Sequence, residues 1–248
     1  MTVLDDLLAS LPAGDVRVRQ VLVGAHWTVV CSRHAGLAAT LMPERPHGHA
    51  RVRHVGRLHE RSARELAELA RSEDLLEASI GVAAINSLLD VDASQAQEIN
   101  AAEALATHGR GRNVALIGRF PFVEQLRTQV GQLWVIEQQP LEDEYPAEAA
   151  ADLLPKAQVI AITGSALINH TLDALLGLCD RGPTVMILGP STPLSPVLFA
   201  HGAHILSGTR VVEETSVLRT VGQGAAFRQI EGAQLLTLVR ADLHPKRG

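Results

Sequence analysis

The stretch Val159-Ile-Ala-Ile-Thr163-Gly-Ser-Ala-Leu-Ile-Asn169 decides the fold, because a continuous apolar run ends at a glycine turn and leads into a helical segment. A strand that is apolar at every position is typical of a parallel sheet covered on both faces. Similar apolar runs occur at 113–118, 133–137 and 184–189, and each is followed by a connecting segment. The sequence therefore predicts repeated β-α units, whose parallel strands are joined by right-handed crossovers.

The segments around these runs complete the second half of the chain. We expect helices over 120–130, 147–154, 167–178 and 213–221, a short helix near Ser195, and a further strand over 204–207. This alternation is typical of a Rossmann-like domain with a mostly parallel sheet. The fold class is therefore predicted to be α/β.

The first half has a different pattern, in which strands come before helices. The predicted elements are strands over 16–23, 27–31 and 36–40, a loop over 43–59, and helices over 62–71 and 74–89. Apolar and polar residues alternate in the first of these strands, as in a half-buried strand. Ser62 and Glu65 form a capping box at the start of the first helix. The second helix is too apolar for a helix on the surface. We expect a small α+β domain over 1–108 and the Rossmann-like domain over 109–248, with a helix over 97–106 that fits either side.

Composition and charge exclude several classes of protein. The hydrophobic content of 46% indicates an ordered globular chain, and the net charge of -5 provides no basic field for nucleic acid. Cys31 and Cys179 lie far apart and support neither a disulfide framework nor a thiolate metal site. The N-terminus lacks a basic region followed by a long apolar run, and no segment is long and apolar enough to span a bilayer, so we expect a cytoplasmic protein.

Ligands in an open parallel sheet collect at the carboxyl ends of the strands, where loops and helix N-termini offer free N–H groups. Four predicted strand ends carry glycine, proline, hydroxyl or carboxylate residues. These ends are Gly118-Arg-Phe-Pro121, Glu137-Gln-Gln-Pro140, Thr163-Gly-Ser-Ala-Leu-Ile-Asn169 and Gly189-Pro-Ser-Thr-Pro193. We expect all four to face one crevice.

Two of these strand ends carry hydroxyl groups, and each can be interpreted either as a ligand site or as ordinary local structure. Thr163, Ser165 and Asn169 suit hydrogen bonding to a phosphate, a carboxylate or a metal-bound oxygen, and they also suit an ordinary helix N-cap. Prolines on both sides make the loop with Ser191 and Thr192 rigid, which favours a preorganised site or merely ends a strand and begins a helix. The sequence leaves both alternatives open.

Glu137 ends an otherwise apolar strand, and it could be a ribose-binding acid, a metal ligand or a solvated strand end. It follows Gly118 by about twenty residues, as the acid of a dinucleotide-binding domain does. However, the segment after Gly118 lacks the Gly-x-Gly-x-x-Gly pattern, which disfavours ordinary NAD binding.

Histidines form a second group of candidate ligands. His47, His49, His54 and His59 gather in the loop over 43–59, and His201 and His204 flank Gly202-Ala203. Histidine clusters can bind metals, but arginines surround the first group and would repel a cation. We therefore favour a solvated loop. His170 could enter the crevice or point away from it.

The order and spacing of these motifs resemble those of the putative heavy-metal chelation family, a family of unknown function. The segments that carry the resemblance are 118–121, Glu137 with Pro140, 163–171, 188–194 and 202–208, together with 23–29 and 79–86 near the N-terminus. The resemblance covers nearly the whole chain. It implies a Rossmann-like C-terminal domain preceded by a domain similar to the N-terminal domain of enolase.

The resemblance also implies a ligand site in a cleft between the two domains. The ligand-binding residues that it implies are Asn86, Gly118, Phe120, Pro121, Thr163, Gly164, Ser165, Asn169, Thr171, Gly189, Pro190, Ser191 and Thr192, with Glu137 as the metal ligand. The implied role is chelation of a heavy metal or a small metal-containing ligand, so a metal ion is the expected cofactor or cargo.

Two other interpretations stay open. One is an enzyme that acts on a phosphate- or carboxylate-bearing small molecule, with or without a nucleotide-like cofactor, in which Glu137 serves as acid or base. The other is a structural role, in which the apolar helix over 74–89 forms an oligomer interface. We expect a homo-oligomer, such as a homodimer, in each case.

Overall fold

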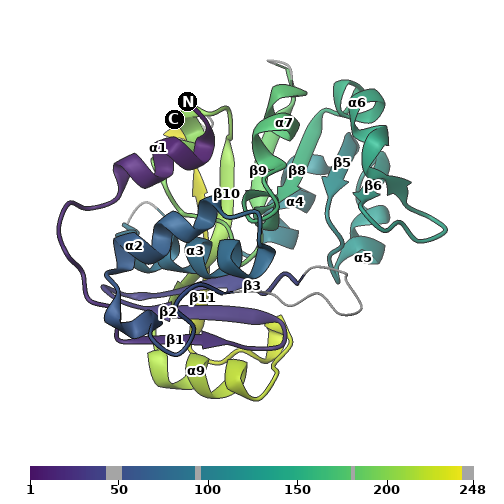
Figure 1. Cartoon of the computed structure of the whole chain (residues 1–248). Helices are drawn as coiled ribbons and strands as arrows, with labels where there is room; N and C mark the ends of the chain where they lie inside the picture. The colour runs from purple at the N-terminus through teal and green to yellow at the C-terminus, as the bar shows by residue number, and fades with distance from the viewer. Residues whose placement is uncertain (43–51, 93–95, 180–181, 242–248) are drawn as a thin grey trace.

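The computed structural model describes residues 1–42, 52–92, 96–179 and 182–241, which form two β-sheets with helices around them (Figure 1). The strands of the larger sheet, in spatial order, are β4 (Ala96–Gln97), β11 (Ala233–Val239), β10 (Ile205–Val211), β9 (Thr184–Leu188), β8 (Val159–Thr163), β5 (Asn113–Ile117), β6 (Gln132–Glu137) and β7 (Tyr145–Pro146). Neighbours from β10 to β7 run parallel, whereas β11 runs antiparallel to both of its neighbours, β10 and β4.

The parallel strands are connected as in doubly wound folds. Numbered along the chain from β5, they lie in the order 3-2-1-4-5-6, which is the order of Rossmann folds. The predicted α/β class is therefore confirmed. The strands expected over 113–118, 133–137, 159–163 and 184–189 all form, within one residue at each end.

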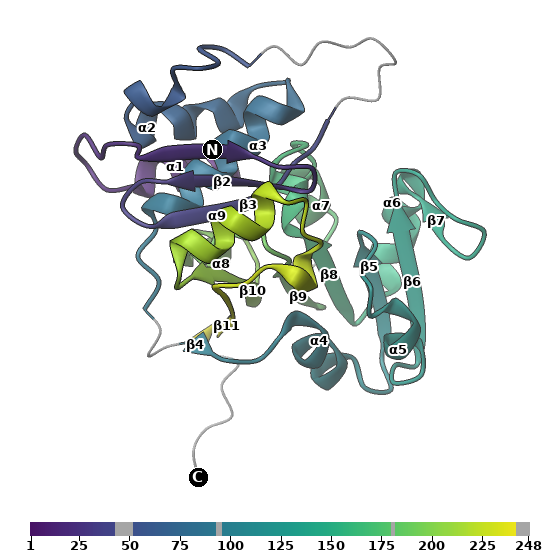
Figure 2. The same ribbon diagram turned by 90° about the horizontal axis from the view of Figure 1, so that it is seen from below.

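Helices cover both faces of this sheet, as Figure 2 shows. On one face lie α4 (Ala101–Gly109) and α5 (Val123–Arg127), and on the other lie α6 (Ala150–Leu153), α7 (Leu172–Gly177) and α8 (Pro196–Ala200). Leu105 of α4 and Leu126 of α5 pack with Leu116 of β5 on the first face. The second face joins a larger core, which continues into the first half of the chain.

The smaller sheet lies between helices from both halves of the chain (Figure 1). Its strands are β1 (Gln20–Val23), β2 (Trp27–Cys31) and β3 (Ala35–Ala39). The helices in this part of the molecule are α1 (Val3–Ser10), α2 (Ala63–Ala67), α3 (Leu75–Leu88) and α9 (Glu214–Gly222). The strands form the predicted antiparallel meander. Val29 and Leu37 of the sheet pack against Val217 and Val221 of α9, so a helix from the second half completes this core.

The apolar helix expected over 74–89 forms as α3, with Asp74 as its N-cap. Nearly all of its side chains are buried, and it packs on β2 and β3 on one side and on α2 on the other. It is therefore wedged between layers, as predicted. The alternative in which this helix forms an oligomer interface is wrong, because its apolar surface is used within the chain.

Two predicted helices are shorter than expected for local reasons. The helix over 120–130 is reduced to α5, which begins after Pro121 and the turn that follows it. The helix over 167–178 is replaced by a 3-10 turn at Gly164–Leu167 and by α7, because His170 between them has a left-handed φ of 60°.

Other differences concern the ends and edges of the sheets. The strand over 16–23 is shortened to β1, and the helix over 97–106 is replaced by β4 and by α4, which begins after the N-cap Asn100. The segment over 147–154 alternates between 3-10 and α-helix. The antiparallel strand β11 was not expected. No helix among the described residues is long and apolar enough to cross a membrane.

The division at 108/109 stays a prediction. Strand β4 precedes residue 109 and α4 ends at it, yet β4 pairs with β11 and α4 packs on β8 and β9 of the larger sheet.

Candidate functional site

The chain reverses direction along the sheet between β5 and β8. The connections from β5 through β6 to β7 run to one side, and those from β8 through β9 to β10 run to the other. Ligands of open α/β sheets bind at the carboxyl ends of the strands beside such a switch point. A Cβ atom at Gly118, after β5, would lie 2.9 Å from Cβ of Thr163 in β8, so the two predicted loops touch at this point.

The loops after β5 and β9 also meet, beside a glycine. Gly118 and Gly189 have φ angles of 109° and 107°, a region that residues with side chains rarely adopt. A Cβ atom at Gly189 would lie 3.7 Å from the ring of Phe120. The glycine therefore allows the chain to turn sharply without placing a side chain against the Phe120 ring.

A pocket of about 300 Å³ opens beside this contact. Four of the predicted site residues line it, namely Phe120, Pro121, Gly189 and Pro190. The pocket is also lined by Ile99, Asn100, Ala101, Ala102, Phe122, Gln125, Ser207, Gly208, Phe227, Arg228, Leu235 and Leu236. It is therefore a mixed apolar and polar cavity on the α4 side of the sheet.

Ser191 and Thr192 follow Pro190 but are buried and do not line this pocket. The hydroxyl of Ser191 accepts a hydrogen bond from the amide of Ala39 at 2.8 Å, and Asn86 Nδ2 donates to the carbonyl of Ser191 at 3.3 Å. These bonds join the loop after β9 to β3 and α3. Thr192 Oγ1 and Asn86 Oδ1 are buried without a hydrogen-bond partner.

Asn86 lines a second pocket, of about 240 Å³, between the end of α3 and the end of β10. His34, Asp90 and Arg210 also contribute to its lining. His34 Nε2 lies 2.8 Å from Oδ1 of Asp90, and this contact is the main reason that the pKa of Asp90 is lowered. The two pockets therefore contain five of the predicted site residues between them, and the other predicted residues line neither, so the expectation that all four strand ends face one crevice is not met.

The residues after β8 are engaged in local hydrogen bonds. Thr163 Oγ1 accepts from the amide of Ser165 at 3.3 Å, and Asn169 Oδ1 accepts from the hydroxyl of Thr171 at 2.7 Å. Gly164, between them, is buried against Thr192. These contacts are those of a capped turn, and none of these residues lines either of the two pockets.

His170 follows Asn169 and points towards the first half of the chain. Its Nε2 atom lies 2.9 Å from the carbonyl oxygen of Ser72, which gives its left-handed backbone a tertiary contact. Three other candidate histidines also have contacts: His201 with Asp6, His54 with Arg61, and His204, whose Nδ1 accepts from the amide of Val185 at 3.1 Å. His47 and His49 lie outside the described residues.

Glu137 lies at the end of β6, half-buried, and accepts a hydrogen bond from the amide of Gln138 at 3.1 Å. The nearby Arg119 forms an ion pair with Glu144 and donates to the carbonyl of Gln139 at 2.9 Å. Arg119 lowers the pKa of Glu144 to about 2, and it also lies within electrostatic reach of Glu137. A guanidinium group at this position competes with any cation for the Glu137 carboxylate.

A bare metal ion does not fit the described residues well. No group of three or more His, Cys, Asp or Glu side chains in this part of the chain is arranged to hold one. Burial raises the pKa of Cys31 to about 12, so this thiol is protonated at neutral pH and cannot act as a thiolate ligand.

Sequence reasoning missed several pocket residues. Phe227 and Arg228 follow the last predicted helix in a 3-10 turn, Phe227–Gln229, and no local pattern connects them to the strand ends. Asn100 could have been predicted as a helix N-cap, because an Asn followed three residues later by a Glu is typical of a helix start. In the structure its side chain accepts a hydrogen bond from the amide of Glu103 at 2.9 Å.

Two family models match the chain. Residues 100–240 match the DUF364 model and residues 4–89 match the DUF4213 model, and both models carry the description "Putative heavy-metal chelation". A curated relative, an uncharacterized protein of Methanocaldococcus jannaschii, is 28% identical over 206 residues, which cover 80% of this chain and 78% of the relative.

Solved structures of the DUF364 family have the same fold. A protein of unknown function from Desulfitobacterium hafniense aligns with a TM-score of 0.81 at 26% identity, covering 96% of this chain and 98% of the other. A second protein of unknown function, from Pyrococcus horikoshii, aligns with a TM-score of 0.78 at 23% identity and the same coverage.

Proposed function

The chain belongs to the family described as "Putative heavy-metal chelation", and on this premise we propose that it binds a metal as part of a small organic complex. In this proposal the protein contacts the organic part of the complex at the carboxyl ends of β5 and β9. The metal keeps the ligands that the organic molecule supplies. This form of binding reconciles the family description with the residues of the site.

The observation that carries the proposal is the composition of the strand-end pocket. Its described lining contains amide, hydroxyl, guanidinium and apolar groups, but no carboxylate, histidine or cysteine side chain. Those three residue types supply nearly all protein ligands for heavy metals. A cavity without them is suited to an organic molecule that carries its own metal ligands.

The same composition favours binding over acid–base catalysis. General acids and bases in enzymes are most often His, Glu or Asp side chains within hydrogen-bond reach of the reacting atom. The described lining contains none of these, and Glu137 lies outside it. An enzyme acting on a phosphate- or carboxylate-bearing molecule therefore has less support than a binding protein.

Native mass spectrometry with elemental analysis tests the proposal. Tag-free protein is incubated with nickel(II) chloride, with nickel(II) citrate and with nickel(II) pyridine-2,6-dicarboxylate. We expect a 1:1 adduct with at least one complex and none with the simple salt. Stoichiometric uptake from the simple salt would contradict the proposal, and so would failure of both complexes to bind.

A pocket-filling variant locates the adduct. Ala102 lines the pocket on α4 and is half-buried, so Ala102→Phe should fill the cavity and abolish adduct formation. Thr107→Phe is the matched control, because Thr107 is exposed on the same helix and does not line this pocket. Equal loss in both variants would place binding elsewhere.

A further inference from the structure

The strand-end pocket concentrates the aromatic residues of the chain. The whole sequence contains only four phenylalanines, and three of them, Phe120, Phe122 and Phe227, line this one cavity. Aromatic side chains provide large, rigid contact surfaces for flat apolar groups. Their concentration here is a property of the site, since the rest of the larger sheet is packed almost entirely with aliphatic residues.

These rings come from two separate segments of the chain that both line the pocket. Phe120 and Phe122 are stacked, with centroids 5.2 Å apart and an interplanar angle of 23°. Phe227 comes from the segment after α9 and is held by Trp27, at a centroid distance of 5.5 Å. A Cβ atom at Gly189 would touch the Phe120 ring at 3.7 Å, so the glycine leaves that part of the ring uncovered by a side chain of residue 189.

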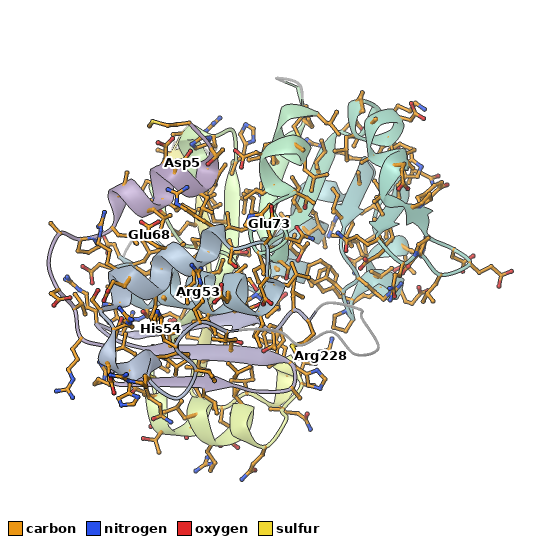
Figure 3. The ribbon with its side chains drawn as sticks, in the orientation of Figure 1. Asp5, Arg53, His54, Glu68, Glu73 and Arg228 are labelled. Carbon is orange, nitrogen blue, oxygen red and sulfur yellow. The ribbon has the colours of Figure 1, made fainter. Side chains whose placement is uncertain are left out.

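Arg228 supplies a positive charge at the same pocket. In Figure 3 it lies below the ends of the parallel strands and to the right of α9. Most arginines of the described chain form ion pairs, as Arg119 does with Glu144, but Arg228 has no ion-pair partner among the described residues. An exposed guanidinium without a partner, at the rim of a pocket, is suited to an anionic group of a ligand.

The start of α4 faces the pocket and adds to this polarity. Asn100 caps the amide of Glu103, whereas the amides of Ala101 and Ala102 precede the first intrahelical acceptor. Both alanines line the pocket. The positive end of the helix dipole therefore reinforces the charge of Arg228.

The floor of the pocket provides a hydrogen-bond acceptor. Thr237 donates its single hydroxyl hydrogen to the carbonyl of Ile99 at 2.9 Å. Ser207, which is only 3% exposed, must then donate its own hydrogen to Thr237, whose oxygen lies 2.6 Å away. The Ser207 oxygen can therefore only accept, which matches an N–H or O–H group on a ligand.

We propose that this pocket binds a planar aromatic carboxylate, with its ring between Phe120 and Phe227 and its carboxylate at Arg228 and the start of α4. The proposal rests on the proposed function and names its ligand class, because aromatic carboxylates with an adjacent ring nitrogen or hydroxyl group are themselves metal chelators.

Isothermal titration calorimetry with three probes tests this ligand class. Quinoline-2-carboxylate is flat and anionic, quinoline-2-carboxamide is flat and neutral, and cyclohexanecarboxylate is anionic without an aromatic ring. The amide cannot form the charge contact with the exposed arginine, so its affinity should be about fivefold lower than that of the acid. Loss of aromatic contacts should weaken cyclohexanecarboxylate by about tenfold.

Variants assign these differences to residues. Arg228→Gln should remove the difference between acid and amide, whereas Arg112→Gln should keep it, because Arg112 is exposed at the opposite, amino-terminal end of β5. Phe120→Leu should weaken both quinolines by about fivefold. Arg228 is exposed, so its substitution leaves the fold intact, and the comparison does not depend on the Phe120 variant.

Several results would overturn the inference. The charge contact is refuted if the quinoline acid and amide bind with equal affinity, or if their difference in affinity persists in Arg228→Gln. The aromatic contact is refuted if cyclohexanecarboxylate binds as tightly as the quinolines. Failure of every probe to bind refutes both. The two proposals can fail separately. Binding of nickel citrate without quinoline-2-carboxylate refutes only the aromatic ligand class, and binding of quinoline-2-carboxylate without either nickel complex refutes only the metal-complex function.

Discussion

Replacing Ser191 by alanine should destabilise the chain, whereas replacing its neighbour Thr192 by valine should not. Both side chains are 2% exposed and both lie in the rigid loop after β9. They differ in one respect. The Ser191 hydroxyl accepts a hydrogen bond of 2.8 Å from the amide of Ala39, and the Thr192 hydroxyl has no partner.

The magnitudes follow from this difference. Ser191→Ala leaves the Ala39 amide without its acceptor, and an unsatisfied buried group costs about 1–3 kcal/mol. Thr192→Val exchanges an unpaired buried hydroxyl for a methyl group of similar size, so the free energy of unfolding should stay unchanged or rise by about 1 kcal/mol.

Urea denaturation measures both effects. We expect a lower midpoint for Ser191→Ala and an equal or higher midpoint for Thr192→Val, with the same dependence on urea concentration in all three proteins. Equal destabilisation by the two substitutions would refute the reasoning. Ligand binding separates the two roles of Thr192. If Thr192→Val abolished ligand binding without lowering stability, the Thr192 hydroxyl would be a ligand contact, as the sequence motif indicated.

Three further outcomes follow from the same structure. Gly164→Ala should destabilise the chain by about 1–3 kcal/mol or more in urea, because its Cβ would lie 2.6 Å from the backbone nitrogen of Thr192. Cys31, with a pKa of about 12, should resist iodoacetamide at pH 8 until the chain is unfolded, and rapid alkylation of the native protein would contradict its burial. The pKa of Glu144 is lowered from 4.5 to about 2, chiefly by Arg119, so this carboxylate stabilises the fold above about pH 4.5 and loses that effect as the pH falls towards 2. The stability difference between the native chain and Glu144→Gln should shrink over that range, and a difference independent of pH would exclude this origin.

The central strands could be predicted from sequence because burial on both faces leaves a simple signal. Residues 159–163 are apolar up to Thr163, and the structure places β8 at those residues. The antiparallel strand β11 lacks this signal, because it is only partly buried. Helix lengths were overestimated where a side-chain contact ends the helix early, as His170 does through the Ser72 carbonyl.

The candidate site was predictable only in part, for a similar reason. Glycine and proline at strand ends are local signals, and they correctly indicated that the loops containing Gly118 and Gly189 lie together. The pocket wall formed by Phe227 and Arg228 comes from a turn more than a hundred residues after Gly118. Only the path of the chain through α9 brings these residues to the strand ends, and no local pattern records that path.

The position of α9 has a consequence for how the protein is made. The face of the smaller sheet that carries Val29 and Leu37 is covered by residues of Glu214–Gly222, which leave the ribosome long after the sheet itself. Until then, the growing chain exposes an apolar sheet surface that it cannot yet cover. The first half therefore completes its folding only after α9 has been translated, and until then chaperones that shield nascent apolar surfaces have access to this face.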